Sequence, residues 1–242
     1  MSETIRIAMW SGPRNISTAM MRAFENRPDT EVIDEPFYAA YLAASGADHP
    51  MREVVLAKQE SDPAKVAQGI VGSGPLGAPI FYQKHMTHHM LPGFERGWME
   101  RCRHAFLIRA PERVLASYAA RRADVEMDDI GFVQQASLFD EATQRMGRAP
   151  PVIDADDVLA DPRRVLGALC AALDIPFHAA MLNWPAGPRP TDGAWAPAWY
   201  DAVLRSTGFA ASPRDAPVLD TRLGAMASAV RPIYERLARD RL

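Results

Sequence analysis

One stretch decides the fold: Ile5-Arg6-Ile7-Ala8-Met9-Trp10-Ser11-Gly12-Pro13-Arg14-Asn15-Ile16-Ser17-Thr18. Residues 5–10 form a mostly apolar run typical of a short strand, and Met20, Met21 and Phe24 follow at helical spacing. The first amides of a helix lack intrahelical partners and the helix dipole adds positive charge there, so a turn between strand and helix can bind an anion. We expect the anion site to comprise Gly12, Pro13, Arg14, Asn15, Ser17 and Thr18.

This loop does not match the Walker A phosphate-binding pattern. No second glycine and no lysine follow Gly12, which argues against hydrolysis of ATP or GTP. Arg14 instead offers a planar fork for phosphate or sulfate oxygens, and Ser17 and Thr18 offer hydroxyl donors. An ordinary strand-to-helix turn capped by Ser or Thr is the open alternative.

A second cation, Arg109, also follows an apolar run. Residues 105–108 have the character of a buried strand, and Pro111 suits the first turn of the next helix. Ligands of open parallel sheets bind outside the carboxyl ends of the strands, so Arg109 is expected on the same edge as Arg14. Ser117 lies about two turns into that helix, where its hydroxyl and the Arg109 fork can close on one anion.

Strand-like and helical segments alternate along the chain. Strands are predicted at about 4–10, 31–34, 79–84, 104–109 and 151–154. Helices are predicted at about 17–26, 36–45, 51–59, 63–70, 111–122, 130–147 and 162–173. Because such alternation gives right-handed crossovers, we expect an α/β fold with helices on both faces of a mostly parallel sheet.

The composition favours one compact enzyme-sized domain over residues 1–242, with 48% hydrophobic and 24% charged residues. A net charge of −3 argues against a nucleic-acid partner. Cys102 and Cys170 are expected to be buried thiols rather than a disulfide. The sequence has neither an apolar leader nor a membrane-length apolar run, so we expect a cytoplasmic protein with no membrane contact. The oligomeric state cannot be predicted.

At these motifs the chain resembles the sulfotransferases, enzymes that take a sulfuryl group from 3′-phosphoadenosine 5′-phosphosulfate. Residues 13–18 resemble their 5′-phosphosulfate loop, and Arg109 and Ser117 fall at the spacing of their 3′-phosphate motif. Residues 156–162 resemble an acidic segment that follows a late core strand in the family. The resemblance spans roughly residues 5–177. It implies a P-loop NTPase-like fold of three αβα layers and a sulfuryl donor that needs no metal.

The chain departs from the family pattern in two places. Asn15 and Ile16 replace the usual Ser-Gly, so the loop is not expected to adopt glycine's conformations at Ile16. No Arg-Lys-Gly segment near the C-terminus completes the 3′-phosphate site, and we expect Arg189 to supply that cation.

Two acids, Asp34 and Glu35, end the second predicted strand. In the resemblance, Glu35 corresponds to the base that deprotonates the acceptor hydroxyl, since an alcohol is a poor nucleophile until its proton is taken. Two alternatives remain open. Asp34-Glu35 can be a Walker B pair that binds Mg²⁺ in a kinase or nucleotidase, or Glu35 can be a structural acid at a helix start.

Lys84 and His85 follow the third predicted strand, where cytosolic sulfotransferases carry Lys-x-His. Met86 stands where that histidine is expected, so we assign Lys84 to the leaving phosphate and His85 to the acceptor, with His88 as the alternative. Three histidines within residues 85–89 also suggest a metal site. They lack a catalytic glutamate at zincin spacing, and we expect no metal.

From about residue 183 the chain becomes rich in proline and tryptophan. We expect an ordered loop over the sheet edge, with Trp195 or Trp199 near the adenine or the acceptor, or else packed on the C-terminal helices. A final helix at 219–237 is expected to be interrupted or kinked near Pro232.

The sequence therefore predicts a sulfotransferase that acts on a hydroxyl or amine of a small-molecule acceptor. The alternatives are a non-catalytic module that binds a nucleotide or metabolite, and a P-loop kinase or nucleotidase.

Overall fold

A computed structural model describes residues 4–72, 74–122, 124–211 and 215–242. Its centre is a five-stranded sheet in the order β2-β3-β1-β4-β5, and every pairing between these strands is parallel. The strands are β1 (Ile5–Ser11), β2 (Thr30–Asp34), β3 (Ile80–Met86), β4 (Arg103–Ile108) and β5 (Val152–Asp154). The sheet confirms the predicted α/β fold.

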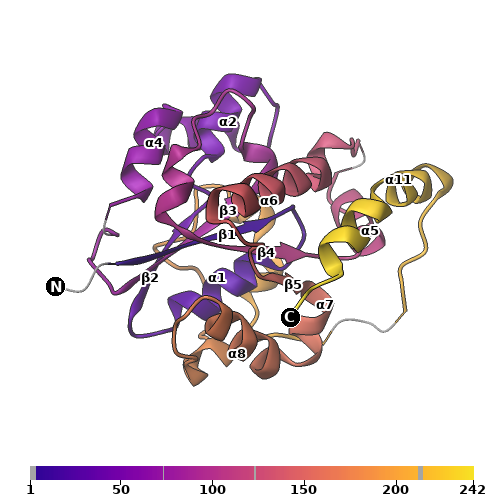
Figure 1. The fold of residues 1–242 in the computed structure, drawn as a ribbon. Helices are drawn as coiled ribbons and strands as arrows, with labels where there is room; N and C mark the ends of the chain where they lie inside the picture. The colour runs from indigo at the N-terminus through magenta and orange to yellow at the C-terminus, as the bar shows by residue number, and fades with distance from the viewer. Residues whose placement is uncertain (1–3, 73, 123, 212–214) are drawn as a thin grey trace.

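Helices follow the strands and cover both faces of the sheet (Figure 1). The longer helices are α1 (Ser17–Glu25), α2 (Tyr38–Ser45), α3 (Arg52–Lys58), α4 (Pro63–Ile70), α5 (Pro111–Ala119), α6 (Phe132–Met146), α7 (Ala155–Ala160), α8 (Pro162–Ala172) and α11 (Thr221–Ala238). Short helices are α9 (Ala196–Trp199) and α10 (Asp201–Leu204), with 3₁₀ turns η1 (Thr87–His89), η2 (Gly97–Arg101), η3 (Asp128–Ile130) and η4 (Ala179–Leu182).

Strand β1 shows how the side chains divide between the two layers. Successive residues of a strand point to opposite faces. Ile7 and Met9 pack with α1 and α8, whereas Ala8 and Trp10 pack with α2, α4 and α6. Both faces are buried, which explains why β1 reads as a continuous apolar run instead of an alternating one.

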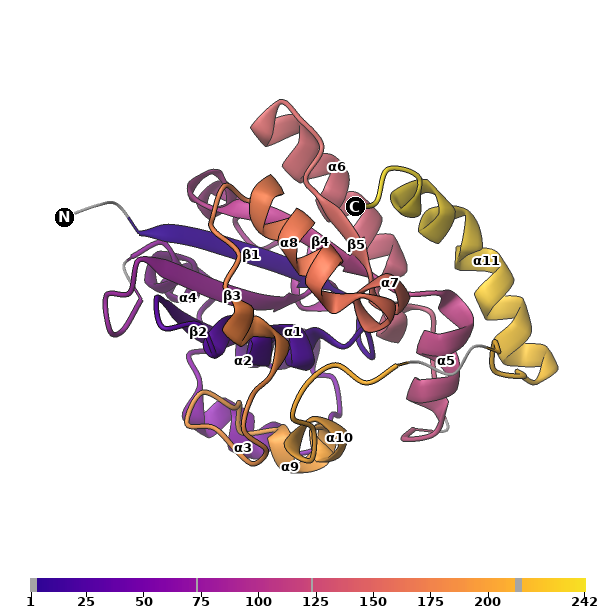
Figure 2. The ribbon, with the colours of Figure 1, turned by 90° about the horizontal axis from the view of Figure 1, so that it is seen from below.

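The carboxyl ends of the strands meet at one edge of the sheet. Because β1 lies at the centre between β3 and β4, the loop at residues 12–16 opens between the ends of its two neighbours. The segment after residue 183 approaches the same end of the molecule, where α9 and α10 lie beside α3 (Figure 2). The fold therefore brings segments that are distant in the sequence together at this edge of the sheet.

Two local predictions differ from the structure. Helix α11 continues through Pro232 to Ala238, so the predicted interruption is wrong, while the alternative of a kink there stays a prediction. Helix α7 was not predicted, since its six residues are too few for a clear period; Asp154 caps it by accepting a hydrogen bond from the Asp156 amide at 2.8 Å. The prediction for the cysteines is confirmed, because both thiols are buried and free.

In the part of the chain that the structure describes, no helix combines the length and apolar character needed to cross a bilayer.

Candidate active site

A cavity of about 450 Å³ lies at the carboxyl edge of the sheet. One part is lined by the loop after β1, together with the end of β4 and α5. Another part is lined by β3, η1 and the aromatic segment at residues 195–200. The lining includes Pro13, Arg14, Asn15, Ser17, Thr18, Glu35, Lys84, Met86, His88, His89, Arg109, Ser117, Tyr118, Trp195, Trp199, Tyr200 and Phe209.

The loop after β1 has a left-handed backbone at two residues that are not glycine. Arg14 has φ 61° and Ile16 has φ 55°. The expectation that Ile16 avoids glycine's conformation is therefore wrong. The Ile16 side chain packs against the core on the α1 side, and this packing holds a conformation that is costly for a β-branched residue.

Helix α1 begins without a side-chain cap. Ile16 occupies the cap position, and no serine or threonine accepts from the first amides of the helix. The alternative of an ordinary turn capped by Ser or Thr is therefore wrong. Ser17 and Thr18 line the cavity beside these amides, so the loop has the form of an anion cradle.

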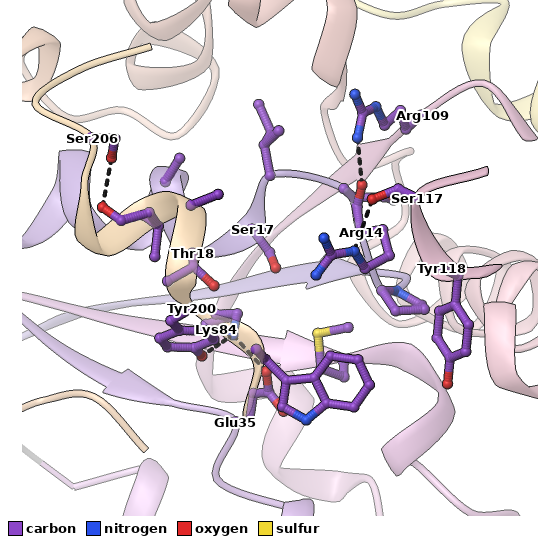
Figure 3. Close-up of a pocket in the computed structure, with 18 of the residues that line it drawn as sticks. Arg14, Ser17, Thr18, Glu35, Lys84, Arg109, Ser117, Tyr118, Tyr200 and Ser206 are labelled. Carbon is purple, nitrogen blue, oxygen red and sulfur yellow. Dashed lines mark hydrogen bonds and ion pairs between the residues drawn. The ribbon is translucent and has the colours of Figure 1, made fainter. Parts of the chain in front are cut away.

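Two arginines converge at this cradle (Figure 3). Arg109 Nη1 donates to the carbonyl oxygen of Arg14 at 2.8 Å, and Arg14 Nε donates to Ser117 Oγ at 2.9 Å. Arg109 Nε is buried without a hydrogen-bond partner in the described residues. Burial lowers the pKa of Arg14, and the charges of Arg121 and Arg109 lower it further. An anion bound here would offset the repulsion among the arginines and would accept a hydrogen bond from Arg109 Nε.

Lys84 is the centre of a buried charge cluster. Its Nζ atom donates to Asp34 Oδ1 at 2.8 Å, to Glu35 Oε1 at 2.5 Å and to the Tyr200 hydroxyl at 2.8 Å. An ammonium has three donors, so Lys84 is fully satisfied. The pKa of Lys84 lies well above its ordinary value because Asp34 and Glu35 outweigh the effect of burial.

Glu35 is a buried carboxyl whose pKa is shifted toward neutral pH. Burial raises its pKa from 4.5 to about 7, with Lys84 opposing that shift and Asp34 adding to it. Its backbone is also left-handed, at φ 42°. A carboxylate that titrates near neutral pH is matched to taking a proton under physiological conditions. Beside it, His89 Nδ1 lies 3.9 Å from Glu35 Oε2.

The structure does not bring His85 to the cavity. Lys84 and His85 are consecutive on β3, so they point to opposite faces of the sheet. The His85 ring stacks on Trp10 and Trp98 at 4.6 and 5.1 Å between centroids, and its Nε2 pairs with Gln83 Oε1 at 3.1 Å. Burial lowers the pKa of His85 to about 3, which keeps the ring neutral.

Of the predicted anion-binding residues, all but Gly12 and Arg189 line the cavity. Gly12 has a packing role, since a Cβ there would lie 2.8 Å from the carbonyl oxygen of Ile130. Arg189 folds back on its own loop and donates from Nη2 to the carbonyl oxygen of Pro185. Asn15 fixes the cradle to β4, because its Nδ2 donates to the Leu107 carbonyl oxygen at 3.0 Å.

Sequence reasoning assigned no role to Tyr200 and did not single out His89 among the histidines of residues 85–89. Tyr200 donates to Asp34 Oδ2 at 2.6 Å and accepts from Trp195 Nε1 at 3.0 Å. His89 stacks on Tyr38 with ring centroids 4.5 Å apart. No motif marks Tyr200, whereas His89 belongs to the histidine cluster at residues 85–89. The cluster of aromatic residues after residue 183 is the signal in the sequence that pointed to this side of the cavity.

Within the described ranges, no group of three or more His, Cys, Asp or Glu side chains is arranged to hold a metal ion.

Comparison with known families gives one match over nearly the whole chain. The model of the sulfotransferase domain matches residues 5–240. Two curated proteins of Arabidopsis thaliana, branched-chain-amino-acid aminotransferase-like proteins 1 and 2, are 43% and 40% identical to the chain over 218 and 211 residues. Those alignments cover 90% and 87% of this chain but only 38% and 37% of the two relatives.

Solved structures of low sequence identity share the fold. A sulfotransferase from Alicyclobacillus acidocaldarius is 14% identical with a TM-score of 0.59, over 100% of this chain and 98% of the other. The sulfotransferase domain from the curacin biosynthetic pathway is 16% identical with a TM-score of 0.55, over 96% and 99%. Mouse sulfotransferase SULT7A1, complexed with PAP, is 12% identical with a TM-score of 0.51, over 99% and 86%. With its matching domain model and its all-parallel sheet, the chain belongs to the sulfotransferase family.

Proposed function

We propose that this protein transfers a sulfuryl group from 3′-phosphoadenosine 5′-phosphosulfate to a hydroxyl or amine of a small-molecule acceptor. The observation that carries the proposal is the convergence of Arg14 and Arg109 on a cradle with an unpaired buried donor. Family membership and the complex of mouse SULT7A1 with PAP support a donor of this type.

The donor's two anionic ends have separate candidate sites. The amides at the start of α1, with Arg14, Ser17 and Thr18, would hold the 5′-phosphosulfate. Arg109 and Ser117 would hold the 3′-phosphate, since both line the cavity at the end of β4 and on α5. Gly12, Arg189 and His85 receive no direct contact in this scheme.

Glu35 would act as the base at the acceptor. As the acceptor oxygen forms its bond to sulfur, its proton passes to the Glu35 carboxylate. The bond between sulfur and the bridging oxygen breaks, and its electron pair remains on the phosphate of the departing adenosine 3′,5′-bisphosphate. Lys84 lines the cavity next to Glu35, and its positive charge, with its three donors already paired, would stabilise that growing negative charge.

A magnesium-dependent kinase fits this site less well. Asp34 and Glu35, the candidate metal ligands, both bind the Lys84 ammonium, so a divalent cation there would have to displace a buried positive charge. The non-catalytic alternative predicts donor binding without turnover. It differs from our proposal in activity and not in structure.

A thermal-shift comparison tests the donor assignment. Adenosine 3′,5′-bisphosphate should raise the unfolding midpoint without divalent metal and by more than 5′-AMP or ATP with Mg²⁺, because binding to the folded state stabilises it by mass action. Single-turnover sulfuryl transfer to a panel of alcohols, phenols and amines then separates an enzyme from a binding module. A shift seen with ATP and Mg²⁺ alone would refute the sulfuryl-donor proposal.

A further inference from the structure

Asp34 is a buried carboxylate to which the proposed chemistry assigns no role. It ends β2 and pairs in register with Lys84 of β3. Its side chain is 1% exposed and does not line the cavity, so it cannot touch a substrate directly. Whatever it does at the site must act through its neighbours.

Both oxygens of Asp34 are used. Oδ1 accepts from Lys84 Nζ at 2.8 Å, while Oδ2 accepts from the Tyr200 hydroxyl at 2.6 Å and from the Gly193 amide at 3.1 Å. The carboxylate therefore joins the catalytic edge of the sheet to a segment about 160 residues later in the chain.

The segment held by Asp34 forms one wall of the cavity. Trp195 and Tyr200 line it, and their side chains are joined by the hydrogen bond from Trp195 Nε1 to the Tyr200 hydroxyl. Trp195 also packs edge-on against Tyr38 with ring centroids 5.0 Å apart. Glu35 lines the same cavity as this wall, so the position of the wall limits the space in which an acceptor can approach the base.

A second anchor holds the same segment at another point. Arg22 of α1 donates from Nη2 to both oxygens of Asp192, at 2.6 and 2.8 Å. Asp192 adjoins Gly193 in the chain, but among the described residues no hydrogen bond or ion pair joins its carboxylate to Lys84 or Glu35. The chain thus contains a natural control: one anchor that carries charge next to the base and one that does not.

We propose that Asp34 is a positioning residue that fixes the Trp195–Tyr200 wall and the Lys84 ammonium in one arrangement around Glu35. One carboxylate sets both the shape of the acceptor space and the placement of the cation beside the base. The catalytic consequence rests on the proposed sulfuryl transfer, whereas the structural coupling does not.

The charge of Asp34 is also felt by the base. The charged and titratable groups that face Glu35 come from every element around it, namely Lys84 of β3, Asp34 of β2, His89 of η1, Tyr38 of α2 and Tyr200. Asp34 raises the pKa of Glu35, and Lys84 lowers it. Removing the Asp34 charge while Lys84 stays should therefore let Glu35 ionise at lower pH.

The first test measures the wall without relying on activity. In Asp34→Asn, hydrogen exchange of the Gly193 amide in the full chain should accelerate by about tenfold or more, as expected when a hydrogen bond to a charged group is lost. Tyr200→Phe should accelerate the same exchange, since it removes the hydroxyl shared by Lys84, Asp34 and Trp195. Asp192→Asn should also loosen the segment by releasing Arg22.

The second test separates the charge of Asp34 from the wall. Asp34→Asn should raise the acceptor KM, reduce kcat by up to about 10²-fold and move the acidic limb of the rate profile to lower pH. Asp192→Asn should leave that limb in place. If Asp34 had a merely structural role, its replacement would lower kcat and kcat/KM together and would leave the acidic limb of the rate profile at the same pH.

Three outcomes distinguish the failures. Unchanged Gly193 exchange in Asp34→Asn overturns the positioning role. Faster exchange in a wild-type protein that transfers no sulfuryl group leaves the role standing and refutes the proposed function. If Asp34→Asn does not fold, Tyr200→Phe decides: faster Gly193 exchange supports the coupling, and wild-type exchange overturns it.

Discussion

Arg109 donates a hydrogen bond from Nη1 to the backbone carbonyl oxygen of Arg14 at 2.8 Å. This contact joins the end of β4 to the loop after β1. The accepting carbonyl belongs to Arg14, whose backbone is left-handed. The proposed sites for the two ends of the donor therefore adjoin one another. A change at Arg109 should be felt first as a loss of selectivity between nucleotides.

Replacing Arg109 with alanine should remove the preference for a 3′-phosphate. We expect adenosine 3′,5′-bisphosphate to lose about 1.5–3 kcal/mol of binding free energy, typical of a hydrogen bond to a charged group. Binding of 5′-AMP should change much less, and titration calorimetry without divalent metal measures both.

Arg113→Ala is the matched control for that experiment. Arg113 is one turn along α5 and pairs with Asp156 at 2.7 Å, away from the cavity. Its variant should keep the preference for the 3′-phosphate. Equal binding of 5′-AMP and the bisphosphate by the wild type would show that Arg109 is wrongly assigned.

Glu35→Gln should separate chemistry from binding. The amide keeps the shape of the side chain but cannot take a proton, so turnover should fall by roughly 10²–10⁴-fold while donor affinity survives. Single-turnover rates and calorimetry on one preparation give both values. Wild-type turnover in the variant would move the base to another group, with His89 as the nearest candidate.

The wild-type rate should rise with pH through an acidic limb near the pKa of Glu35, about 7. The base must be ionised to work, so the rate is low below this pH and reaches a plateau above it. The limb should disappear in Glu35→Gln. A profile that is flat between about pH 5 and 8 would contradict the assignment.

The stability of the folded protein should also depend on the ionisation of Glu35, but it should fall as pH rises. Because the folded pKa of Glu35 is raised from 4.5 to about 7, its contribution to stability is complete below 4.5 and lost as pH rises through 7. The melting temperature of Glu35→Gln relative to wild type should therefore increase from about pH 5 to about pH 8. Each kcal/mol corresponds to about 2–4 °C in a chain of this size. Parallel melting curves across that range would argue against a buried, titrating Glu35.

His85→Phe should retain wild-type turnover. The ring stacks between aromatic side chains on the face of the sheet away from the cavity, and phenylalanine preserves that stacking. Steady-state kinetics on folded protein provide the measurement. A loss as large as that of Glu35→Gln would require His85 to reach the acceptor by a rearrangement of β3.

Gly12→Ala should destabilise the fold by about 1–3 kcal/mol, the usual effect of overpacking. The new Cβ would meet the Ile130 carbonyl oxygen at 2.8 Å, and this backbone atom cannot move aside like a flexible side chain. Gly167→Ala, within α8 and with open space around its Cβ, should stabilise by about 0.5–1 kcal/mol. Denaturant unfolding of both variants tests the contrast.

The sheet was predictable because its signal is local. Each strand is a short apolar run, and the run at residues 5–10 is buried on both faces by helices that follow in the sequence. Arg14, Arg109 and Glu35 could be placed at one edge because parallel strands share their carboxyl ends. These predictions needed only the order of the elements.

Side-chain direction within an element was harder to predict. His85 and Lys84 differ by one position, and a shift of one residue in register moves a side chain to the other face of the sheet. Tyr200 was invisible for another reason, since its contacts with Lys84 and Asp34 depend on the path of an irregular segment. The left-handed backbone of Ile16 is likewise held by core packing, in opposition to the intrinsic preference of a β-branched residue.

The strand order has a consequence for how the protein folds. Strand β1 is synthesised before the other four strands, yet its neighbours are β3 and β4, which pair with it through contacts such as Ile7 with Tyr82 and Ile7 with Arg103. No hairpin can protect this apolar segment, because every partner lies beyond a crossover. Folding must close long chain loops before the central strand is paired, which makes it slow and exposes β1 to aggregation during synthesis. The central strand therefore stays without its two neighbours until both β3 and β4 have been synthesised.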